Sequence, residues 1–212
     1  FVAHAWGRVV APAVSECPLP LGGGWTRHGR LAVWVQVTGA LRLNQALLRG
    51  GGSVGDRVYV SCTLGHAAGA LAFLQEQWQP EPDHAEFLLN RFNRPLARLE
   101  LGCGLLGLAS AAIDISDGLL ADAGHVAAAS GVRICIDTDL LPLSEALRSR
   151  DCKETILRWA LTGGDDYELC FFLPVDATAP PGCTCIGHVE AGAGVDCGME
   201  IDIPAGYQHF SD

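Results

Sequence analysis

Two acidic, glycine-bearing segments hold the residues of this chain that could do chemistry. They lie about fifty positions apart and read AAIDISDGLLADAGHV at 111–126 and LTGGDDYEL at 161–169. Carboxylate oxygens are the ligands that Mg²⁺ prefers, and glycines allow a phosphate to approach the backbone closely. Together the two segments indicate a site for magnesium and a phosphorylated ligand.

The first segment places polar side chains at the junction between a strand and a helix. A short apolar run reads as the end of a buried strand, and Asp114, Ser116 and Asp117 follow it. Gly118 then allows the chain to turn into a helix predicted over 119–130. Two aspartates and phosphate oxygens suffice for Mg²⁺, a serine hydroxyl can donate to phosphate, and a helix N-terminus carries partial positive charge. The alternative is that Asp114 or Ser116 only caps the helix.

The second segment holds two glycines, then three carboxylates, then an apolar run that predicts a strand over 167–173. Glycines permit close approach of backbone to ligand, and clustered carboxylates in an apolar setting favour a functional site. An ordinary loop is the alternative, because paired glycines and aspartates are common turn residues. The residues concerned are Gly163, Gly164, Asp165, Asp166 and Glu168.

These residues resemble the thiamine-monophosphate kinase family, within the superfamily that also holds aminoimidazole ribonucleotide synthetase and selenophosphate synthetase. The motifs specific to that kinase are IDISDGL with the Asp122 and His125 that follow, and LRWALTGGDDYELCF. The resemblance covers most of residues 20–210. It extends to GDRVYVSCTLGHAAGALAFLQ at 55–75, RFNRP at 91–95, GHV at 187–189 and AGYQHF at 205–210.

The resemblance implies ATP-dependent phosphorylation of thiamine monophosphate to thiamine diphosphate, with Mg²⁺ as cofactor and ATP as co-substrate. The family transfers the phosphoryl group directly and in line to the substrate phosphate, without a covalent enzyme intermediate. Catalysis of this kind rests on positioning and on neutralising charge. Members of the family are homodimers, so a homodimer is expected here.

The resemblance also implies roles for individual residues. An arginine can neutralise phosphate charge, an aromatic ring can stack on a flat heterocycle, and a carboxylate can meet a cationic thiazolium. Without the resemblance, the arginine would read as a surface charge and the aromatic as a packing residue. The implied roles are magnesium ligands at Asp114 and Asp117, nucleotide contacts at Gly23, Gly24, Arg49 and Ser116, and thiamine-phosphate contacts at Asp165 and Tyr207.

The chain departs from the family pattern at three positions. Where the family carries Gly-Gly-Asp-Thr-Thr-Arg, residues 22–27 read GGGWTR, so Gly24 replaces a magnesium-binding aspartate and Trp25 replaces a small hydroxyl residue. Asp165 stands where the family usually has glutamate, which keeps the charge but shortens the reach. Further metal-binding aspartates of the family fall in a segment that would precede residue 1. We therefore expect an incomplete metal site in this chain.

Composition excludes some classes of protein. The 212 residues are 49% hydrophobic and 18% charged, which is typical of a globular chain that can bury a sizeable core. Only 14 lysines and arginines are present and the net charge is −10, so a nucleic-acid surface is not expected. A phosphate ligand would therefore arrive with its metal.

The cysteines and the N-terminus indicate an intracellular setting. The nine cysteines are odd in number and several lie in apolar runs, so we expect buried free thiols. The CTC at 183–185 has the wrong spacing for a zinc knuckle. The apolar N-terminus is interrupted by charged residues and proline, which favours neither a signal peptide nor a membrane span. A cytoplasmic protein is expected, with no membrane partner.

Strands and helices alternate along the chain, which predicts a fold of the α/β to α+β class. The resemblance narrows this to the aminoimidazole ribonucleotide synthetase-like two-domain fold. Residues 1–54 would be the last part of an N-terminal domain that forms the dimer and binds metal and nucleotide, and 55–212 a C-terminal α+β sandwich. Further strands are predicted at 31–39, 57–62, 132–136, 184–189 and 199–203, and further helices at 66–78, 83–90, 96–108, 144–149 and 153–161.

Three functional hypotheses stay open. In the first, the chain is the kinase, met as a fragment whose missing segment supplies the remaining magnesium ligands. In the second, it is a non-catalytic remnant that still binds nucleotide or thiamine phosphate, and Gly24 favours this. The third is another reaction of the same superfamily, against which GGDDYEL and the terminal GYQHF argue.

Overall fold

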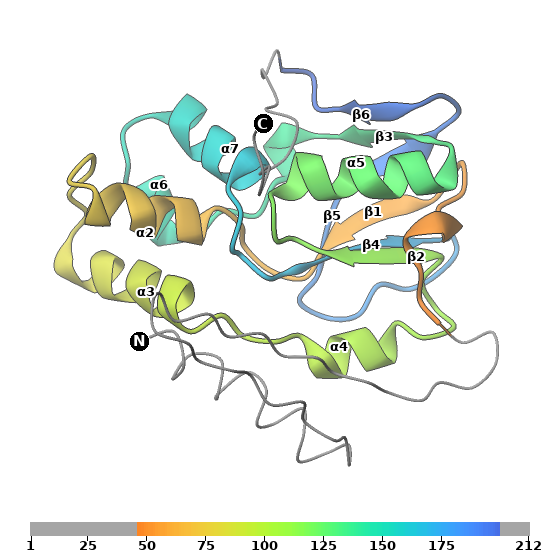
Figure 1. Ribbon diagram of the computed structural model, residues 1–212, viewed down its shortest axis with the longest axis horizontal. Helices are drawn as coiled ribbons and strands as arrows, with labels where there is room; N and C mark the ends of the chain where they lie inside the picture. Colours follow the sequence, from red (N-terminus) through yellow and green to blue (C-terminus); the bar gives the residue numbers. More distant parts are fainter. Residues whose placement is uncertain (1–45, 200–212) are drawn as a thin grey trace, which may run out of the picture. The chain divides into compact units, whose positions relative to one another are not determined.

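The computed structural model describes residues 46–199. Residues 47–199 belong to one compact unit (Figure 1). Several predictions fall outside the described residues, namely the strand at 31–39, nearly all of the strand at 199–203, and the roles of Gly23, Gly24 and Tyr207.

Six strands of the described residues form one sheet in the order β2-β4-β1-β5-β3-β6. Neighbouring strands are antiparallel, apart from β3 and β6, which run parallel. Most of the strands are rich in the β-branched and aromatic residues that suit a pleated, half-buried surface. The strands are β1 (Arg57–Val60), β2 (Ala111–Asp114), β3 (Arg133–Ile136), β4 (Leu169–Leu173), β5 (Thr184–Glu190) and β6 (Gly194–Asp196).

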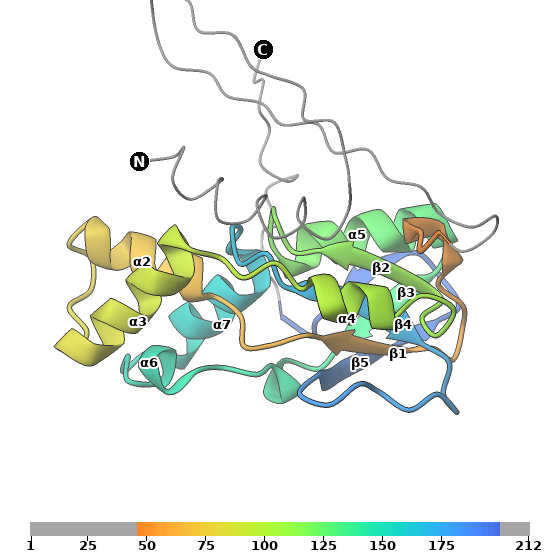
Figure 2. The same ribbon diagram turned by 90° about the horizontal axis from the view of Figure 1, so that it is seen from below.

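Helices lie against the sheet and beside one end of it (Figures 1 and 2). Over residues 46–199 they are η1 (Arg49–Gly51), α2 (His66–Leu74), α3 (Pro82–Asn93), α4 (Leu99–Gly104), α5 (Leu119–Ser130), η2 (Thr138–Leu140), α6 (Glu145–Arg148) and α7 (Lys153–Thr162). The long helix α5 lies across one face of the sheet, while α2, α3, α6 and α7 gather at one end. The fold is therefore α+β, as predicted.

The sheet forms two apolar cores because successive strand residues point to opposite faces. Phe172 and Ile134 are fully buried on the face that carries α5, where they belong to one cluster with Val126 of that helix. Tyr59 and Phe171 point the other way and stack with their ring centroids 5.6 Å apart. Leucines of α4 and the turn after it pack on this second face.

A third core joins the helices at the end of the sheet. The fully buried Leu88 of α3 and Leu147 of α6 lie at its centre. The guanidinium carbon of Arg150 lies 5.7 Å from the ring centroid of Trp78 and 4.9 Å from that of Trp159, a cation–π arrangement. This helical group positions the start of α2 and the end of α7, which both flank the site described below.

Several details of the prediction were wrong. The helix expected over 66–78 ends at Leu74, and the strand expected over 57–62 ends at Val60. The helix expected over 96–108 forms only at α4, and the strand expected from 167 begins at Leu169. The late start of that strand has a local cause, because Asp165 and Tyr167 have positive φ angles of 63° and 50° and so cannot be regular strand. The short strand β6 was not predicted.

The cysteines of the described residues are all free, but only two of the eight are buried. Cys170 and Cys197 behave as small core residues, whereas Cys103 and Cys152 are exposed. The expectation of free thiols is confirmed and that of general burial is wrong. Among residues 46–199, no helix has the length and apolar character needed to cross a membrane.

The contact between the start of α2 and α7 generates a stability prediction. Gly65 and Gly55 both have positive φ, of 86° and 93°, but a Cβ on Gly65 would lie 3.0 Å from the Ala160 nitrogen while one on Gly55 meets nothing within 4 Å. Gly55→Ala should cost about 1–2 kcal/mol from backbone conformation alone. Gly65→Ala should cost about 2 kcal/mol more from overpacking. Urea unfolding of both variants measures this, and equal losses would contradict the close contact.

Candidate functional site

The turn between β2 and α5 is held by a buried carboxylate. The backbone N–H groups of Ser116, Asp117 and Gly118 donate to the same oxygen, Oδ2 of Asp122, at 2.9, 3.0 and 3.1 Å. Burial raises the pKa of Asp122, the hydrogen bonds oppose that rise, and the charges of Asp117 and Asp114 add to it. The N–H groups that Asp122 accepts from belong to the turn and to Gly118, the N-cap of α5, so these three groups are not free to bind a phosphate. The helix itself begins at Leu119, and a phosphate facing its N-terminus stays a prediction.

The second acidic segment runs directly beside this turn. The N–H of Asp165 donates to the Ser116 carbonyl at 2.9 Å, and the N–H of Tyr167 donates to the Ile115 carbonyl at 2.9 Å. In the other direction, the N–H of Ile115 donates to the Glu168 carbonyl at 2.8 Å. These bonds continue the pairing of β2 with β4 past the end of both strands. Two segments far apart in the sequence therefore form one backbone platform.

Glycines make this approach of the two segments possible. A Cβ on Gly118 would lie 2.8 Å from the carbonyl group of Thr162, and one on Gly164 would lie 2.5 Å from the Ser116 carbonyl oxygen. Gly118 also has a φ of 117°, which side-chain-bearing residues rarely adopt. At both positions, therefore, glycine is needed so that the two backbone segments can lie in contact. The sequence had indicated only that glycine would let a ligand approach the backbone.

The middle carboxylate of the second segment has a structural role. Asp166 is buried and accepts hydrogen bonds from the N–H groups of Gly65 at 2.5 Å and Ala67 at 3.2 Å, which caps the start of α2. Burial raises the pKa of Asp166 to about 6, against the lowering effect of these two hydrogen bonds. The carboxylate therefore ties the second segment to α2.

The last carboxylate of the segment lies in a buried ion cluster. Glu168 is fully buried and takes a two-point contact from Arg98, whose Nε and Nη2 lie 2.7 and 2.6 Å from its oxygens. Arg91 and the Ser61 hydroxyl also donate to it. Burial alone would raise the pKa of Glu168, but the hydrogen bonds from Arg98 and Ser61 and the arginine charge lower it. The RFNRP segment thus serves this ion cluster.

The first carboxylate, Asp165, is the one of the three that faces solvent. The Tyr167 hydroxyl donates to its Oδ1 at 3.0 Å, and both residues hold positive φ angles. Burial and then the charge of Asp165 raise the pKa of Tyr167 to about 12, with further contributions from Asp114 and Asp117. Backbone strain of this kind is common at binding sites. Tyr167 therefore lies within electrostatic reach of all three candidate carboxylates.

Asp114 and Asp117 have the features expected of ligands for a hard cation. Within residues 46–199, neither side chain makes a hydrogen bond or an ion pair, and Asp114 is exposed at the end of β2. Asp117, Asp122 and His125 offer ligand atoms that lie within 4.8 Å of one another. Carboxylate oxygens without protein partners suit Mg²⁺, which binds one or two carboxylates and keeps several waters. The donor chemistry of Asp114 and Asp117 therefore suits a magnesium ion, while the grouped ligand atoms are those of Asp117, Asp122 and His125.

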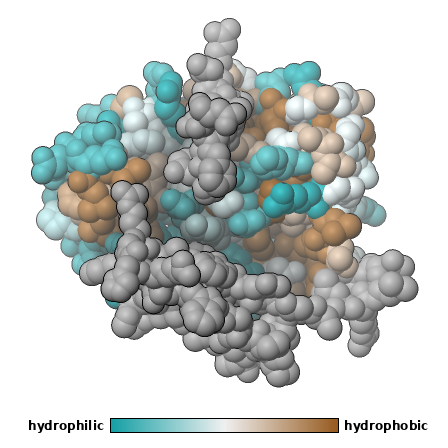
Figure 3. All heavy atoms as spheres, viewed as in Figure 1, coloured by the Kyte–Doolittle hydropathy of each residue, from teal (hydrophilic) through white to brown (hydrophobic). Residues whose placement is uncertain are grey.

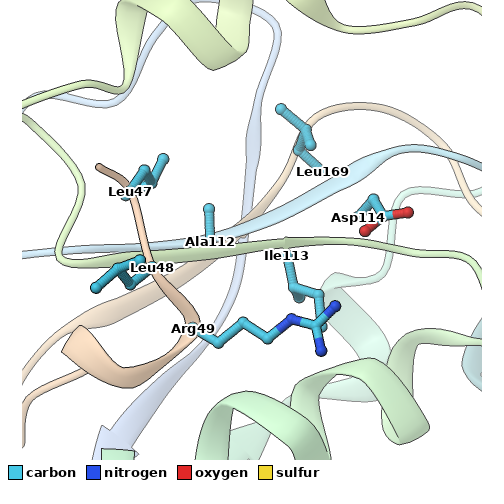
Figure 4. Close-up of a pocket in the computed structure, with 7 residues that line it drawn as sticks. All are labelled: Leu47, Leu48, Arg49, Ala112, Ile113, Asp114 and Leu169. Carbon is cyan, nitrogen blue, oxygen red and sulfur yellow. The ribbon is translucent and has the colours of Figure 1, made fainter. Parts of the chain in front are cut away.

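A cavity of about 580 Å³ opens beside Asp114. Figure 4 shows Arg49 reaching it from η1 and Asp114 bordering it from the end of β2. Hydrophilic residues gather near the middle of this face of the molecule, with hydrophobic residues around them (Figure 3). An apolar hollow between a cation and a carboxylate could hold a flat ring with attached phosphates. Its lining consists of Leu47, Leu48, Arg49, Ala112, Ile113, Asp114 and Leu169.

The structure places the predicted residues in two neighbouring groups. Ser116 and Asp165 are joined through their backbones on the platform that also carries Asp114 and Asp117, while Arg49 shares the cavity with Asp114. Gly23, Gly24 and Tyr207 lie outside the described residues. Sequence reasoning gave no role to the residues that support the site, although four belong to quoted motifs. They are Arg91, Arg98, Asp122, Tyr167 and Glu168.

The buried ion cluster generates a second stability prediction. Glu168→Gln leaves two arginines without their counter-charge, so it should lower the free energy of unfolding by about 3–5 kcal/mol. Asp139→Asn is the matched control, because Asp139 pairs with Lys153 at 2.9 Å with both side chains more than 70% exposed. That change should cost less than about 1 kcal/mol. Urea denaturation compares the two, and similar losses would show that the cluster does not stabilise the platform.

The raised pKa of Asp166 predicts how stability depends on pH. Its carboxyl titrates at 3.8 in the unfolded chain and at about 6 in the folded one. Between these values the folded state binds more protons, so the contribution of Asp166 is full below 3.8 and is lost as pH rises through 6. The difference in unfolding free energy between the original chain and Asp166→Asn should fall by about 3 kcal/mol over this range. A difference that grows with pH would contradict the assignment.

The chain is similar to proteins of known activity along most of its length, although no family model matches it. The thiamine-monophosphate kinase of Salmonella typhimurium is 39% identical over an alignment of 209 positions, which covers 91% of this chain and 64% of that protein. The thiamine-monophosphate kinase of Aquifex aeolicus is 37% identical over an alignment of 194 positions, which covers 90% of this chain and 62% of that protein.

Solved structures of the same kinase share the fold. The thiamine-monophosphate kinase of Stenotrophomonas maltophilia is 41% identical, with a TM-score of 0.68 over 73% of this chain and 54% of that one. A ThiL structure complexed with AMPPCP and TMP is 38% identical, with a TM-score of 0.69 over 77% of this chain and 54% of that one. The Escherichia coli hydrogenase maturation protein HypE shares the fold alone, at 23% identity and a TM-score of 0.62. The aminoimidazole ribonucleotide synthetase-like fold is therefore confirmed.

The chain spans somewhat less than two thirds of the length of the curated relatives it matches, at 64% and 62% of the two given above. Within that span, the match runs through both acidic segments and through the strands and helices that carry them. In sequence and in fold, the chain is similar to thiamine-monophosphate kinases along most of its length.

Proposed function

We propose that this chain is part of an enzyme that phosphorylates thiamine monophosphate to thiamine diphosphate with ATP, by direct in-line transfer. The observation that carries the proposal is the pair Asp114 and Asp117, which stand without protein partners among residues 46–199 and beside Asp165 on the shared platform. A solved relative with the same fold is complexed with AMPPCP and TMP, which are the two kinds of ligand that the reaction needs.

The proposed magnesium site uses Asp114 and Asp117. Mg²⁺ bound there would neutralise phosphate charge during transfer. The two carboxylates would hold the ion at the end of β2, on the platform that Asp122 fixes through its three backbone hydrogen bonds. Arg49 would add positive charge from the protein at the cavity that Asp114 borders.

The proposed nucleotide and substrate contacts lie on either side of this metal site. Arg49 would contact the nucleotide phosphates from the cavity, and the Ser116 hydroxyl would donate to a phosphate oxygen. Asp165 would face the cationic ring of thiamine monophosphate, positioned by its hydrogen bond from Tyr167. Gly23 and Gly24 are proposed at the nucleotide and Tyr207 at the substrate, by resemblance to the family.

The wider organisation proposed for the protein follows the family. Residues 1–54 would belong to an N-terminal domain and 55–212 to the C-terminal domain. The active form would be a homodimer in the cytoplasm. Gel filtration with light scattering tests the dimer independently of activity.

A second candidate function is binding without turnover. Gly24 stands where the family pattern has a magnesium-binding aspartate, and its loss would weaken catalysis more than nucleotide binding. Calorimetric titration with Mg·AMPPCP separates the two functions from each other. A chain that binds the nucleotide analogue but forms no thiamine diphosphate from ATP would be the non-catalytic form.

Substitution of the metal ligands tests the proposed reaction. Asp114→Asn and Asp117→Asn should each lower kcat by on the order of 100-fold or more in a complete, active form of the enzyme, since transition-state charge loses its stabilisation. The folded structure should persist, because neither side chain has a partner to lose within residues 46–199.

Asp176→Asn is the matched control, since Asp176 is exposed in a loop after β4. Its kcat should stay within about twofold, as expected of a surface substitution away from the site. A coupled assay for thiamine diphosphate measures all three variants. Full activity in Asp114→Asn would overturn the proposed role of that carboxylate.

A further inference from the structure

A second cluster of metal-ligand side chains lies on β3 and β5, away from the candidate active site. We propose that Cys135, His188 and Glu190 form a binding site for a zinc-type divalent ion. Their ligand atoms, one sulfur, one imidazole nitrogen and one carboxylate oxygen, all lie within 4.8 Å of one another. The sulfur and nitrogen donors suit Zn²⁺ and not Mg²⁺, which prefers oxygen alone.

The strand register brings these three residues together. Cys135 is the direct partner of His188 in the antiparallel pair β3–β5. Glu190 follows His188 by two positions, so its side chain projects from the same face of the sheet. Directly opposite residues have Cβ atoms about 4.5–5.5 Å apart. A tetrahedral zinc ion at about 2.0–2.3 Å from each donor needs donor separations of roughly 3.3–3.8 Å. Side-chain rotation alone can close that difference.

The cluster is open to solvent, and the two strands that carry it are anchored in the core. Side-chain exposure is 56% for His188 and 52% for Glu190, while Cys135 is half-buried between them and the neighbouring strand. The alternate residues Ile134 and Val189 are buried in the core under α5, which fixes both strands. An ion could therefore enter directly, and three protein ligands would leave one coordination position for water.

Charge at the cluster favours a cation. His188 Nε2 lies 2.9 Å from Glu190 Oε1, so these two groups already pair in the absence of an ion. Two positive charges are near in the strand register. Arg133 is engaged by Asp196, the residue beside Cys135 in the parallel pair β3–β6, and Arg57 is the partner of His188 in the pair β1–β5. With Cys135 as thiolate, three negative groups, those of Cys135, Glu190 and Asp196, face these two guanidinium groups. Binding of zinc would release the proton of the Cys135 thiol. The hydrogen bond between His188 and Glu190 would give way to bonds from both side chains to the ion.

The cluster is separate from the magnesium site. Four inter-strand steps lie between β2, which ends at Asp114, and β3, which carries Cys135. At about 4.8 Å a step, the two strands are roughly 19 Å apart across the sheet. The site therefore does not depend on the proposed kinase activity, and each can fail while the other holds.

Titration of the purified chain with Co²⁺ tests the site, since a thiolate-bound Co²⁺ gives a ligand-to-metal charge-transfer band in the near ultraviolet. We expect this band to saturate at one equivalent and Zn²⁺ to displace the cobalt. Cys135→Ser should abolish the band and weaken zinc binding by about 100-fold or more. His188→Gln should keep a thiolate band but also weaken the binding of zinc.

Two control variants separate this site from other thiols of the chain. Cys103 is exposed on α4, and Cys183 belongs to the C-T-C pair, so Cys103→Ser and Cys183→Ser should leave the band and the zinc affinity unchanged. Circular dichroism checks that each variant is folded. If Cys135→Ser does not fold, His188→Gln tests the site in its place. The proposal is overturned if the original chain gives no thiolate band, if Cys183→Ser removes it, or if neither Cys135→Ser nor His188→Gln changes zinc affinity.

Discussion

The structure of the candidate site depends on the close backbone contact between the turn after β2 and the segment before β4. Two hydrogen bonds at 2.9 Å, from Asp165 and Tyr167, join these segments, and Gly118 and Gly164 leave the space that the contact requires. Because the contact is made by backbone atoms, it holds the exposed carboxylates in place without using them. Asp114, Asp117 and Asp165 thus stay available to a ligand.

Buried charges then fix this platform to the rest of the fold. Asp122 holds the turn, Asp166 caps α2, and Glu168 sits among arginines of α3 and of the segment before α4. Each of these carboxylates is buried and accepts two or more hydrogen bonds. Within residues 46–199, Asp114 and Asp117 have no side-chain partner, and Asp165 accepts a hydrogen bond from the Tyr167 hydroxyl. The acidic residues of the two motifs therefore have two different roles. Some hold the fold together, and only the others are proposed to contact a ligand.

The sequence predicted the strands and helices well where apolar periodicity was strong, as at α5, which was placed at its observed bounds. It also placed Asp114 and Asp117 correctly at the junction between a strand and a helix. Local sequence patterns could not show that Asp165 faces solvent while Asp166 and Glu168 are buried. The directions of these side chains follow from the positive φ angles of Asp165 and Tyr167, which such patterns do not reveal. Nor could local patterns show that Arg91 and Arg98 lie seventy or more positions from their partner, Glu168.

The measurement that tests the central claim most directly is anomalous X-ray scattering from Mn²⁺, used in place of Mg²⁺, in crystals of the chain grown with AMPPCP and thiamine monophosphate. We predict an anomalous peak between the carboxylates of Asp114 and Asp117, with phosphate oxygens of the analogue bound to the same ion and the thiazolium ring beside Asp165. An ordered nucleotide whose metal lies away from both aspartates would contradict the account.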